Sequence, residues 1–299
     1  MTQTILITGA SGLVGRELTR TLSAAGHRVL PLRRKSQTAP FWDIDRNIIE
    51  LGDCGPIDAV INLAGENIAA GRWTAARKKR IRQSRVESAS LLAKFFAAAK
   101  QKPKVLISAS AIGFYGDRGD EVLTEASPAG TGFLAQVAQE WEAAIQPAAA
   151  VGIRTVQLRF GIVLSPAGGA LAKMLPSFTM GLGGVIGSGR QWMSWISLRE
   201  LPGIISHILR HEELRGPINA VSPGPVSNRN FTRTLAAVLR RPALLPVPRL
   251  LLRLLLGEMA EELLLASAKA QPRQLLDTGY VFQEPELEPA LRHLLGKPG

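Results

Sequence analysis

Short apolar runs and helically spaced apolar residues alternate at the start of the chain. Residues 5–7 form a continuous apolar run, and apolar residues then recur with helical spacing through Leu18 and Leu22. Residues 28–32 form the next mostly apolar run. Such runs are typical of strands buried in a parallel sheet, and a helical stripe between two of them is typical of a strand–helix–strand unit. We therefore predict that the chain opens with a βαβ unit.

The same alternation continues further along the chain. Four more apolar runs predict strands, at residues 58–62, 105–108, 155–158 and 218–221. Helical stripes predict helices over residues 133–145, 198–209 and 250–256, and a further helix that is capped by Ser227 or Asn228 and runs to Leu239. Because strands that alternate with helices indicate an α/β fold, we predict a doubly wound, mostly parallel sheet with a smaller C-terminal α+β lobe.

A glycine-rich turn joins the first predicted strand to the first predicted helix. Residues 8–15 read Thr-Gly-Ala-Ser-Gly-Leu-Val-Gly. This glycine spacing allows a sharp turn, close approach of a pyrophosphate and close packing of the helix on the sheet. The helix N-terminus then faces the anion. The turn predicts a dinucleotide site, and the alternative is a glycine-rich turn that holds no ligand.

Basic residues end the second predicted strand. A protein that prefers NAD usually has an acidic residue here, which accepts a hydrogen bond from the ribose 2′-hydroxyl. This chain instead has Arg33, Arg34 and Lys35. Because a guanidinium can bind a phosphate through two parallel hydrogen bonds, the trio favours the 2′-phosphate of NADP(H). The alternative is that the three side chains are simply solvated.

Small and polar residues follow the next two predicted strands. Open α/β sheets bind ligands at the carboxyl ends of their strands, which is where residues 63–66, Leu-Ala-Gly-Glu, lie. Glu66 can reach a cofactor or a substrate, or belong to a polar loop. Ser108, Ser110 and Tyr115 come after the following strand. Ser110 can hydrogen-bond a reacting oxygen and Tyr115 can donate a proton, although Ser110 can equally be a satisfied turn hydroxyl.

A basic cluster occupies residues 72–85. On a 3.6-residue helix Arg85 falls on the stripe of Ile81, Ser88 and Leu92, whereas most of the other cations point elsewhere. We therefore predict that most of the cluster is a solvated face and that Arg85 projects toward the interior, where it needs an anionic partner. Nucleic-acid binding needs aromatic side chains for stacking, and these make up only 5% of the chain, so we expect no nucleic-acid partner.

Composition and charge indicate the cellular compartment of the protein and the class of ligand that it binds. A single cysteine, Cys54, excludes an internal disulfide, and four scattered histidines lack metal-ligand spacing, which indicates a reduced, cytoplasmic setting without a structural metal. The chain opens directly into a predicted strand, so we expect no signal peptide. The net charge of +12 favours anionic small ligands.

The leucine-rich stretch at residues 250–256 is too short to cross a bilayer and contains Arg253. We predict that it is a helix docked on the domain or a dimer surface, rather than a membrane anchor. We therefore expect no membrane partner and leave a homodimer open.

Several of these motifs together resemble the extended and atypical short-chain dehydrogenase/reductase superfamily. The resemblance covers nearly the whole chain and rests on residues 8–15, 62–65 and 108–116. Within that superfamily the chain is similar to the subgroup described as NAD-dependent or sugar-nucleotide epimerases. This similarity is carried by residues 61–67, 168–175, 181–184, 187–192, 195–196, 241–248 and 256–259.

The resemblance also implies a departure from the superfamily's chemistry. The usual acid/base pair is Tyr-x-x-x-Lys on the helix after the serine, and the corresponding positions here are Leu134 and Ala138. Ser110 is retained, and Arg85 corresponds to the superfamily's upstream asparagine. Met193 stands where extended members carry an arginine that grips a sugar-nucleotide diphosphate, so the resemblance does not extend to that substrate.

Arginine and tryptophan residues gather in the glycine-rich loop over residues 181–195. A guanidinium beside indoles suits a planar or anionic ligand, so Arg190, Trp192 and Trp195 are the predicted substrate residues. The alternative is a surface loop in which Trp195 belongs to the core.

Together these observations predict a Rossmann domain over residues 1–160 that binds NADP(H), and a substrate-side lobe over residues 161–299 that returns elements to it. The predicted cofactor-binding residues are Thr8, Gly9, Ser11, Gly12, Leu13, Val14, Gly15, Arg33, Arg34, Leu63, Ala64, Gly65, Glu66, Ser108 and Arg159, and the predicted catalytic residues are Ser110, Arg85 and Tyr115. The predicted function is an NADP(H)-dependent oxidoreductase or epimerase-like enzyme acting on a small polar substrate. The alternative is a non-catalytic NADP(H)-dependent regulator or assembly factor, because the Tyr-x-x-x-Lys pair is absent.

Overall fold

An eight-stranded sheet forms the centre of the computed structural model, which describes residues 2–36 and 38–298. Its strands, in spatial order, are β12 (Gly216–Ala220), β8 (Arg154–Phe160), β6 (Val105–Ala111), β5 (Ala59–Asn62), β1 (Thr4–Thr8), β2 (Arg28–Arg34), β3 (Phe41–Asp43) and β4 (Ile48–Glu50). All neighbouring strands in this sheet are parallel apart from β3 and β4. The predicted doubly wound, mostly parallel sheet is confirmed.

The strand order reverses at β1. Its neighbours are β2 on one side and β5 on the other, and Thr8 lies opposite Leu32 and Asn62 in the two ladders. The carboxyl ends of these three strands therefore meet at one edge of the sheet. This is the switch point at which open α/β sheets bind ligands.

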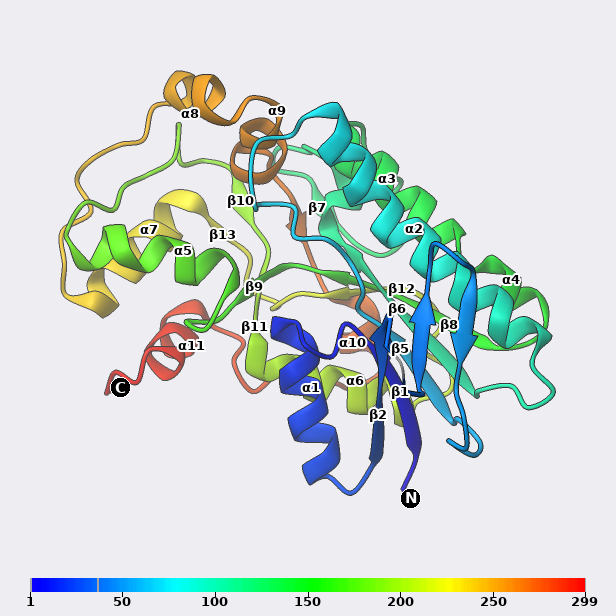
Figure 1. Cartoon of the computed structure of the whole chain (residues 1–299). Coiled ribbons are helices and arrows are strands. Elements are labelled where there is room, and N and C mark those ends of the chain that lie inside the picture. Colours follow the sequence, from blue (N-terminus) through cyan, green and yellow to red (C-terminus); the bar gives the residue numbers. More distant parts are fainter. Residues whose placement is uncertain (1, 37, 299) are drawn as a thin grey trace.

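Helices cover both faces of the sheet (Figure 1). One face is covered by α1 (Leu13–Ala24) and α6 (Leu201–Arg210), and the other by α2 (Ala75–Ala98), α3 (Phe133–Ala143) and α4 (Gln146–Ala150). Side chains of a strand alternate between its two faces, and accordingly Ile5 and Ile7 join the first core whereas Leu6 joins the second.

Two helices differ in detail from the predicted ones. The helix predicted over residues 133–145 ends at Ala143, and the chain resumes as α4, which has Pro147 in its first turn. A proline is tolerated there because its missing N–H would have no partner within the helix. The helix predicted over residues 198–209 opens with a 3₁₀ turn, η2 (Leu198–Glu200), before α6.

The second half of the chain is shared between the sheet and a smaller lobe. Residues of α6 and β12 belong to the main sheet and its core. Three other helices, α5 (Gly169–Thr179), α7 (Asn228–Leu239) and α11 (Leu287–Leu294), enclose a separate core that contains Trp195 and Phe231 and lies to the left of the sheet in Figure 1. Ser227 caps α7 as predicted, since its hydroxyl accepts a hydrogen bond from the Asn230 backbone N–H.

Short strand pairs and turns complete the chain. The pairs are β9 (Ile162–Leu164) with β11 (Trp195–Ser197), β10 (Trp192–Met193) with β13 (Val226–Ser227), and β7 (Val122–Leu123) with β14 (Lys269–Ala270). The remaining elements are the 3₁₀ turn η1 (Ile112–Tyr115), α8 (Arg249–Leu256), α9 (Glu258–Ala260), the π-helical turn η3 (Glu261–Leu265) and α10 (Arg273–Asp277). Among residues 2–36 and 38–298, no helix has the length and apolar character needed to cross a membrane.

Candidate functional site

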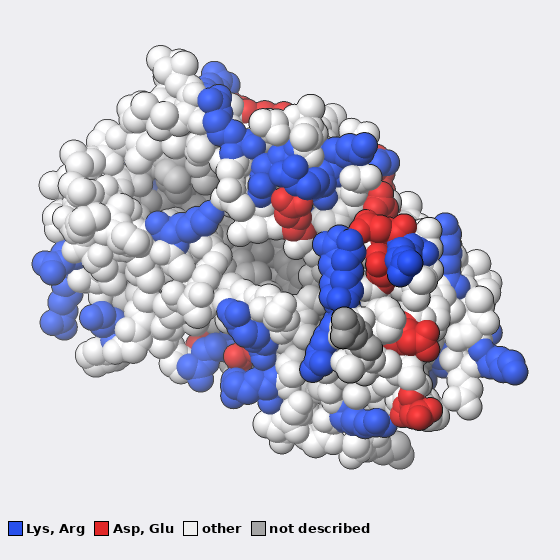
Figure 2. Space-filling model, viewed as in Figure 1, with Lys and Arg blue, Asp and Glu red and all other residues white. Residues whose placement is uncertain are grey.

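A cavity of about 960 Å³ opens at the switch point, where β1, β2 and β5 end. Its lining comes from the glycine-rich turn, the first turns of α1, the end of β2, the β3 edge, the segment after β5 and one residue of α2. These residues are Gly9, Ala10, Ser11, Arg16, Thr19, Arg20, Pro31, Leu32, Arg33, Arg34, Trp42, Ile44, Ala64, Gly65, Glu66 and Ser84. Figure 2 shows a hollow near the middle of one face of the molecule, with Lys and Arg side chains around it.

The glycine-rich turn is packed too closely for side chains at two of its positions. Gly9 has φ +67°, and a Cβ there would lie 2.8 Å from the Leu63 carbonyl oxygen. A Cβ at Gly15 would overlap the Gly9 carbonyl oxygen. The first turn of α1 has no side-chain cap at Gly12, so its backbone N–H groups remain available to an anion. Both features are those of a turn that cradles a pyrophosphate.

Thr8 orients the segment after β5 and does not line the cavity. Its buried hydroxyl donates a hydrogen bond to Asn62 Oδ1 at 2.7 Å and accepts from the backbone N–H groups of Leu63 and Ala64 at 3.1 and 3.2 Å. Asn62 in turn donates to the buried Ser108 hydroxyl at 3.3 Å. Thr8 therefore orders the backbone of Leu63 and Ala64, and Asn62 links it to Ser108, while neither Thr8 nor Ser108 is among the residues that line the cavity.

Four arginines line the cavity together. Arg33 and Arg34, predicted from the sequence, are joined by Arg16 and Arg20 of α1. Sequence reasoning missed the second pair, although their spacing of four residues places them on one helix face and was a usable signal. Arg20 also pairs with Glu17 at 2.5 Å. Such a concentration of guanidinium groups beside a helix N-terminus suits a ligand with several phosphates.

Glu66 and Leu63 differ in how they relate to the cavity. Ala64, Gly65 and Glu66 line it, whereas Leu63 packs into the hydrophobic cores. The Glu66 carboxylate lies 3.4 Å from both Arg77 and Arg80, so it is held by cations of α2. This arrangement favours a structural role for Glu66 at the rim.

Arg85 projects into the interior from α2. Its guanidinium carbon would lie 3.3 Å from a Cβ on Gly65, and it sits 5.2 Å from the centre of the Trp141 ring. One nitrogen donates to the Ile81 carbonyl oxygen at 3.1 Å, and no carboxylate of residues 2–36 or 38–298 comes within ion-pair distance. Burial lowers the pKa of Arg85 to about 10, and the Glu66 carboxylate partly opposes this shift. Arg85 is therefore a partly buried cation, beside the cavity wall, that has no carboxylate partner among the described residues.

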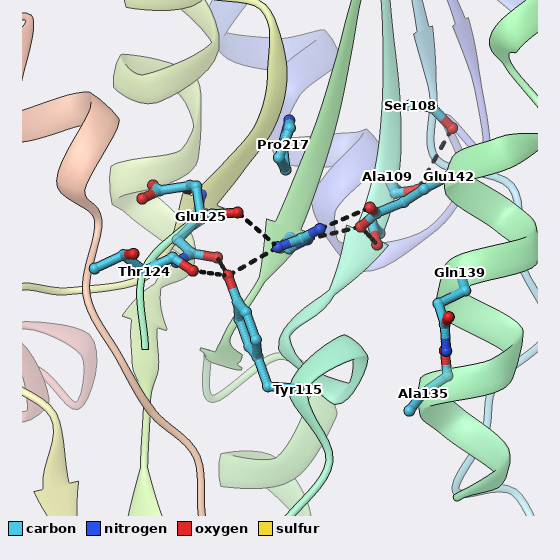
Figure 3. Close-up of polar contacts among 12 residues, drawn as sticks. Ser108, Ala109, Tyr115, Thr124, Glu125, Ala135, Gln139, Glu142 and Pro217 are labelled. Carbon is cyan, nitrogen blue, oxygen red and sulfur yellow. Dashed lines mark hydrogen bonds and ion pairs between the residues drawn. The ribbon is translucent and has the colours of Figure 1, made fainter. Parts of the chain in front are cut away.

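Ser110 and Arg159 meet at a carboxylate that sequence reasoning missed. The Ser110 hydroxyl donates to Glu142 Oε1 at 2.7 Å, and Arg159 donates to both Glu142 oxygens at 2.7 and 2.8 Å. The Arg159 guanidinium also stacks on Phe114, 3.5 Å from the ring centre. Figure 3 shows Glu142 with dashed lines from its carboxylate to neighbouring side chains. The structure thus assigns Arg159 to a buried ion pair and does not bring it to the cofactor cavity.

Glu142 could have been found from the helix pattern. It lies four residues after Ala138 and eight after Leu134, on the stripe of α3 where the superfamily carries its Tyr and Lys. A carboxylate on an otherwise inward-facing stripe needs a cationic partner. Arg159 is that partner.

Tyr115 is completely buried and its hydroxyl is engaged on all sides. The oxygen lies 2.9 Å from the Thr124 carbonyl oxygen and 2.8 Å from Asn219 Oδ1, and it accepts from Arg159 at 2.9 Å (Figure 3). Burial raises the pKa of Tyr115. The geometry therefore makes Tyr115 a structural phenol and does not present it to the cavity as a proton donor.

The predicted substrate loop splits into three environments. Trp195 is fully buried and donates to the Gly224 carbonyl oxygen at 2.9 Å. It therefore belongs to the core, which was the alternative to a role in substrate binding. Trp192 donates to Asp120 at 2.7 Å and is covered by Lys269, whose Nζ lies 4.2 Å from the ring centre. Arg190 lines a second, smaller cavity of about 270 Å³ together with Asp117, Asp120, Ser188 and Arg249 among others. The structure does not bring the three residues together around one ligand.

The helix that should carry the Tyr-x-x-x-Lys pair is covered by the C-terminal segment. Both oxygens of Glu262 accept hydrogen bonds at 2.7 Å, from the backbone N–H groups of Phe133 and Leu134. A Cβ at Gly132, which has φ +104°, would lie 2.9 Å from Glu262 Oε1. A carboxylate from more than a hundred residues away therefore caps α3, and no sequence signal pointed to it.

The fold, the glycine-rich turn and the arginine-lined cavity define a Rossmann protein built to hold a phosphorylated dinucleotide. Residues 5–220 match the profile of the NAD dependent epimerase/dehydratase family, and residues 247–294 match a domain of unknown function, DUF1731. The chain belongs to the NAD-dependent epimerase/dehydratase family. The resemblance to epimerase-like short-chain dehydrogenases/reductases is confirmed.

Particular relatives extend over the full chain. The epimerase family protein Mb2239 of Mycobacterium bovis is 40% identical over 298 residues, which cover 99% of this chain and 98% of that protein. The crystal structure of the human epimerase family protein SDR39U1 with NADPH is 35% identical, covers 98% of this chain and 99% of that chain, and has a TM-score of 0.90. A nucleoside-diphosphate sugar epimerase from Corynebacterium glutamicum is 37% identical with a TM-score of 0.81, and this chain spans 59% of its length.

Proposed function

We propose that the protein binds NADP(H) in the large cavity and acts as an NADP(H)-dependent oxidoreductase or epimerase-like enzyme on a small polar substrate. The observation that carries the first part is the set of four arginines, Arg16, Arg20, Arg33 and Arg34, around a turn with no room for side chains at Gly9 and Gly15. The human relative whose structure contains NADPH supports the same cofactor. Bound NADP(H) supplies or accepts a hydride.

The part of the dinucleotide that each segment would bind follows from the position of that segment in the fold. Gly9 to Gly15 and the N-terminus of α1 would bind the pyrophosphate, and Arg33 and Arg34 the 2′-phosphate. Ala64 and Gly65 would let the dinucleotide pass close to the end of β5. These residues line one continuous cavity, except for Gly12 to Gly15, which contribute backbone at the start of α1.

Arg85 is the proposed source of positive charge for the reaction. A partly buried guanidinium without a carboxylate partner stabilises negative charge that develops on a nearby oxygen, because surrounding protein screens it less than water does. Gly65 is the residue between Arg85 and the cavity, and its missing side chain leaves the guanidinium close to the wall. Ser110 completes the proposed site as a hydroxyl whose proton is held by Glu142.

A second candidate function is a non-catalytic NADP(H)-dependent regulator or assembly factor. One specific observation favours it: Ser110 donates to Glu142, and Tyr115 is buried with its hydroxyl engaged, so neither hydroxyl is free to protonate a substrate. The positions of the usual acid/base pair hold Leu134 and Ala138. Such a protein would bind the cofactor tightly and transfer no hydride.

The experiment that tests the proposal measures binding and turnover separately. Purified protein is titrated with NADPH and NADH, and then incubated with NADPH or NADP⁺ and a panel of small carbonyl and hydroxyl compounds while absorbance of the reduced nicotinamide is followed. We expect preferential NADPH binding and turnover of a polar substrate that falls by about 10²-fold or more in Arg85→Ala and is partly retained in Arg85→Lys. Arg82→Ala, at an exposed position of the same helix whose partner is Glu140, is the matched control.

The outcomes separate the two candidates. Tight NADPH binding without turnover across the panel favours the regulator. Turnover that is unchanged in Arg85→Ala and Ser110→Ala removes both residues from the site. Failure to bind either nucleotide contradicts the whole proposal.

A further inference from the structure

Exposed leucines gather on one part of the C-terminal half. Among the described residues thirteen large hydrophobic side chains are exposed, and eight of them fall in two neighbouring segments. We call these eight the leucine surface: Met180, Leu182, Leu244, Leu245, Leu250, Leu251, Leu254 and Leu255. The two segments touch, because Leu182 and Ala243 form a β-bridge. Single exposed apolar residues are ordinary, but a cluster of this kind marks an interaction surface.

The helix α8 presents most of this surface outward. Leu250 and Leu254 are 68% and 67% exposed, and Leu251 and Leu255 lie beside them, each pair being four residues apart on one helix face. Leu252 faces inward and is buried. Figure 1 shows α8 at the outer edge of the molecule, and it packs mainly against α9. The prediction of a helix docked on the domain therefore holds for one side of α8 only.

Arginines share the chain segment that carries six of these leucines. The stretch from residue 240 to residue 257 contains four arginines and no aspartate or glutamate. Arg249 and Arg253 share one carboxylate, that of Glu261 on η3. Arg240 and Arg241 form no ion pair with any residue in the described parts of the chain. The segment thus combines protruding apolar side chains with an excess of positive charge at their edge.

We propose that the leucine surface docks on the surface of a lipid bilayer that contains anionic phospholipids. An amphipathic helix with leucines on one side inserts its apolar side chains at the headgroup boundary. Arg240 and Arg241, which precede α8 and pair with no described carboxylate, would attract anionic headgroups. The protein would lie on the bilayer and not cross it. This inference revises the expectation of no membrane partner, and it is independent of the proposed enzymatic function.

Two features favour a bilayer over another protein molecule. Stretch 240–257 contains no aromatic residue, whereas the cores of protein–protein interfaces are enriched in Tyr, Trp and Phe. A second copy of this chain would bring the arginine sets of two molecules of net charge +12 close together, and like charges across an interface disfavour association. An anionic bilayer complements both the leucines and the arginines.

The test is flotation of the full-length protein with vesicles of two compositions, phosphatidylcholine alone and an equal mixture of phosphatidylcholine and phosphatidylglycerol. We expect the protein to float with the mixed vesicles only, and less so as ionic strength rises. Leu250→Ser/Leu254→Ser should reduce the bound fraction by at least about tenfold, since exposed leucines contribute through insertion. Arg240→Gln/Arg241→Gln should reduce it by roughly tenfold or more, at about 1 kcal/mol for each charge.

The control variant is Val281→Ser, which removes an apolar side chain that is 83% exposed and lies outside the leucine surface. It should float like the unmodified protein. Light scattering after size-exclusion chromatography is run on the same samples. Absence of flotation with the mixed vesicles, or equal flotation with both compositions, overturns the proposal. A dimer that Leu250→Ser/Leu254→Ser dissociates would assign the surface to a second copy instead.

Discussion

At the scale of residues, two inward-facing arginines, Arg159 buried and Arg85 partly buried, differ in role because they differ in partners. Arg159 donates two parallel hydrogen bonds to Glu142, so its charge is neutralised within the protein. Arg85 donates only to a backbone carbonyl, and no carboxylate of the described residues forms an ion pair with it. Removing one partner of a buried pair leaves the other charge unpaired, whereas a cation with no carboxylate partner keeps its charge available to a bound anion. We therefore expect Arg159 to matter for folding and Arg85 for function.

Arg34→Ala tests the proposed 2′-phosphate site. The loss of a charge-assisted hydrogen bond of about 1.5–3 kcal/mol should weaken NADPH binding roughly tenfold to a hundredfold. NADH lacks the 2′-phosphate, so its affinity should not change. Isothermal titration calorimetry with both nucleotides measures this. Arg46→Ala, an exposed arginine outside the cavity, is the control, and an equal loss for NADH would place Arg34 at another part of the dinucleotide.

Glu125 makes folding stability depend on pH. Burial raises the pKa of this carboxyl, although backbone N–H groups, that of Asn219 among them, oppose the shift, and its Oε2 has no hydrogen-bond partner. The folded state therefore holds the proton more tightly than the unfolded state. Protonated Glu125 therefore contributes to the free energy of unfolding. This contribution is fully present below the pKa of the unfolded carboxyl, about 4.3, and is lost as pH rises through the raised pKa of the folded state.

Glu125→Gln should remove that dependence, because the amide resembles the protonated carboxyl and its carbonyl oxygen can still accept from Asn219 and Gln274. Urea unfolding over a pH series measures the free energy of unfolding of both proteins. We expect the free energy of unfolding of the variant to rise relative to that of the unmodified protein as pH increases. Glu87→Gln, at an exposed position, should show no such trend, and a constant difference for Glu125→Gln would contradict the assigned cause.

At the scale of elements, the N-terminus of α3 depends on a distant turn. Glu262 of η3 supplies the carboxylate that accepts from the first two N–H groups of the helix. Helices lacking a local cap leave these groups unpaired unless another part of the chain reaches them. Gly132 leaves the space that this carboxylate occupies. The family's C-terminal region thus fixes the start of the helix on which the superfamily places its acid/base pair.

A double-mutant cycle tests this contact. Glu262→Ala should cost about 1–2 kcal/mol of unfolding free energy, as for loss of a cap at a helix N-terminus. Gly132→Ala should also destabilise the protein, but by less when Glu262 is already removed, because part of its effect is collision with the carboxylate. A coupling of at least about 0.5 kcal/mol is expected from chemical denaturation.

Glu261→Ala on the same turn is the control for this cycle. Its carboxylate pairs with Arg249 and Arg253, which are half-exposed, so its loss should cost no more than about 1 kcal/mol. Strict additivity of Gly132→Ala and Glu262→Ala would show that the two residues do not interact.

At the scale of the whole molecule, the C-terminal region is part of three separate cores. Leu275 packs with the core on the α1 and α6 face of the sheet, Ala270 with Tyr115 and Leu123, and Leu291 with Trp195 in the smaller lobe. β14 also pairs with β7, which comes from the first half of the chain. The region therefore completes the fold and is not a detachable appendage.

Deleting residues 247–299 should prevent stable folding. The buried leucine, alanine and tryptophan side chains of all three cores would become exposed to water, at about 25 cal/mol for each Å² of apolar surface. Soluble yield, circular dichroism and resistance to trypsin measure the result. Removing only the last three residues is the control and should leave all three unchanged. A folded, protease-resistant deletion variant would contradict the shared cores.

The sequence by itself determined the βαβ opening, the parallel sheet and the glycine-rich turn, because these follow from local periodicity and from the backbone freedom of glycine. It also predicted the inward direction of Arg85, since helical phase is a local property. Helical spacing also carried a signal for Glu142 of α3 and for the two arginines of α1, but it did not identify the groups that they face. No sequence signal at all pointed to Glu262 at the start of α3. The roles of these residues depend on contacts between segments as far apart as Phe133 and Glu262, which no local pattern encodes.

Tertiary packing likewise decided between the alternatives that the sequence left open. Trp195 is core and Tyr115 is structural because each is enclosed by elements from both halves of the chain. The leucines of α8 remain outside because only one side of that helix meets a neighbour. Burial and pairing are properties of the assembled chain, so only the tertiary structure could separate a buried, satisfied side chain from one that faces a ligand or a surface.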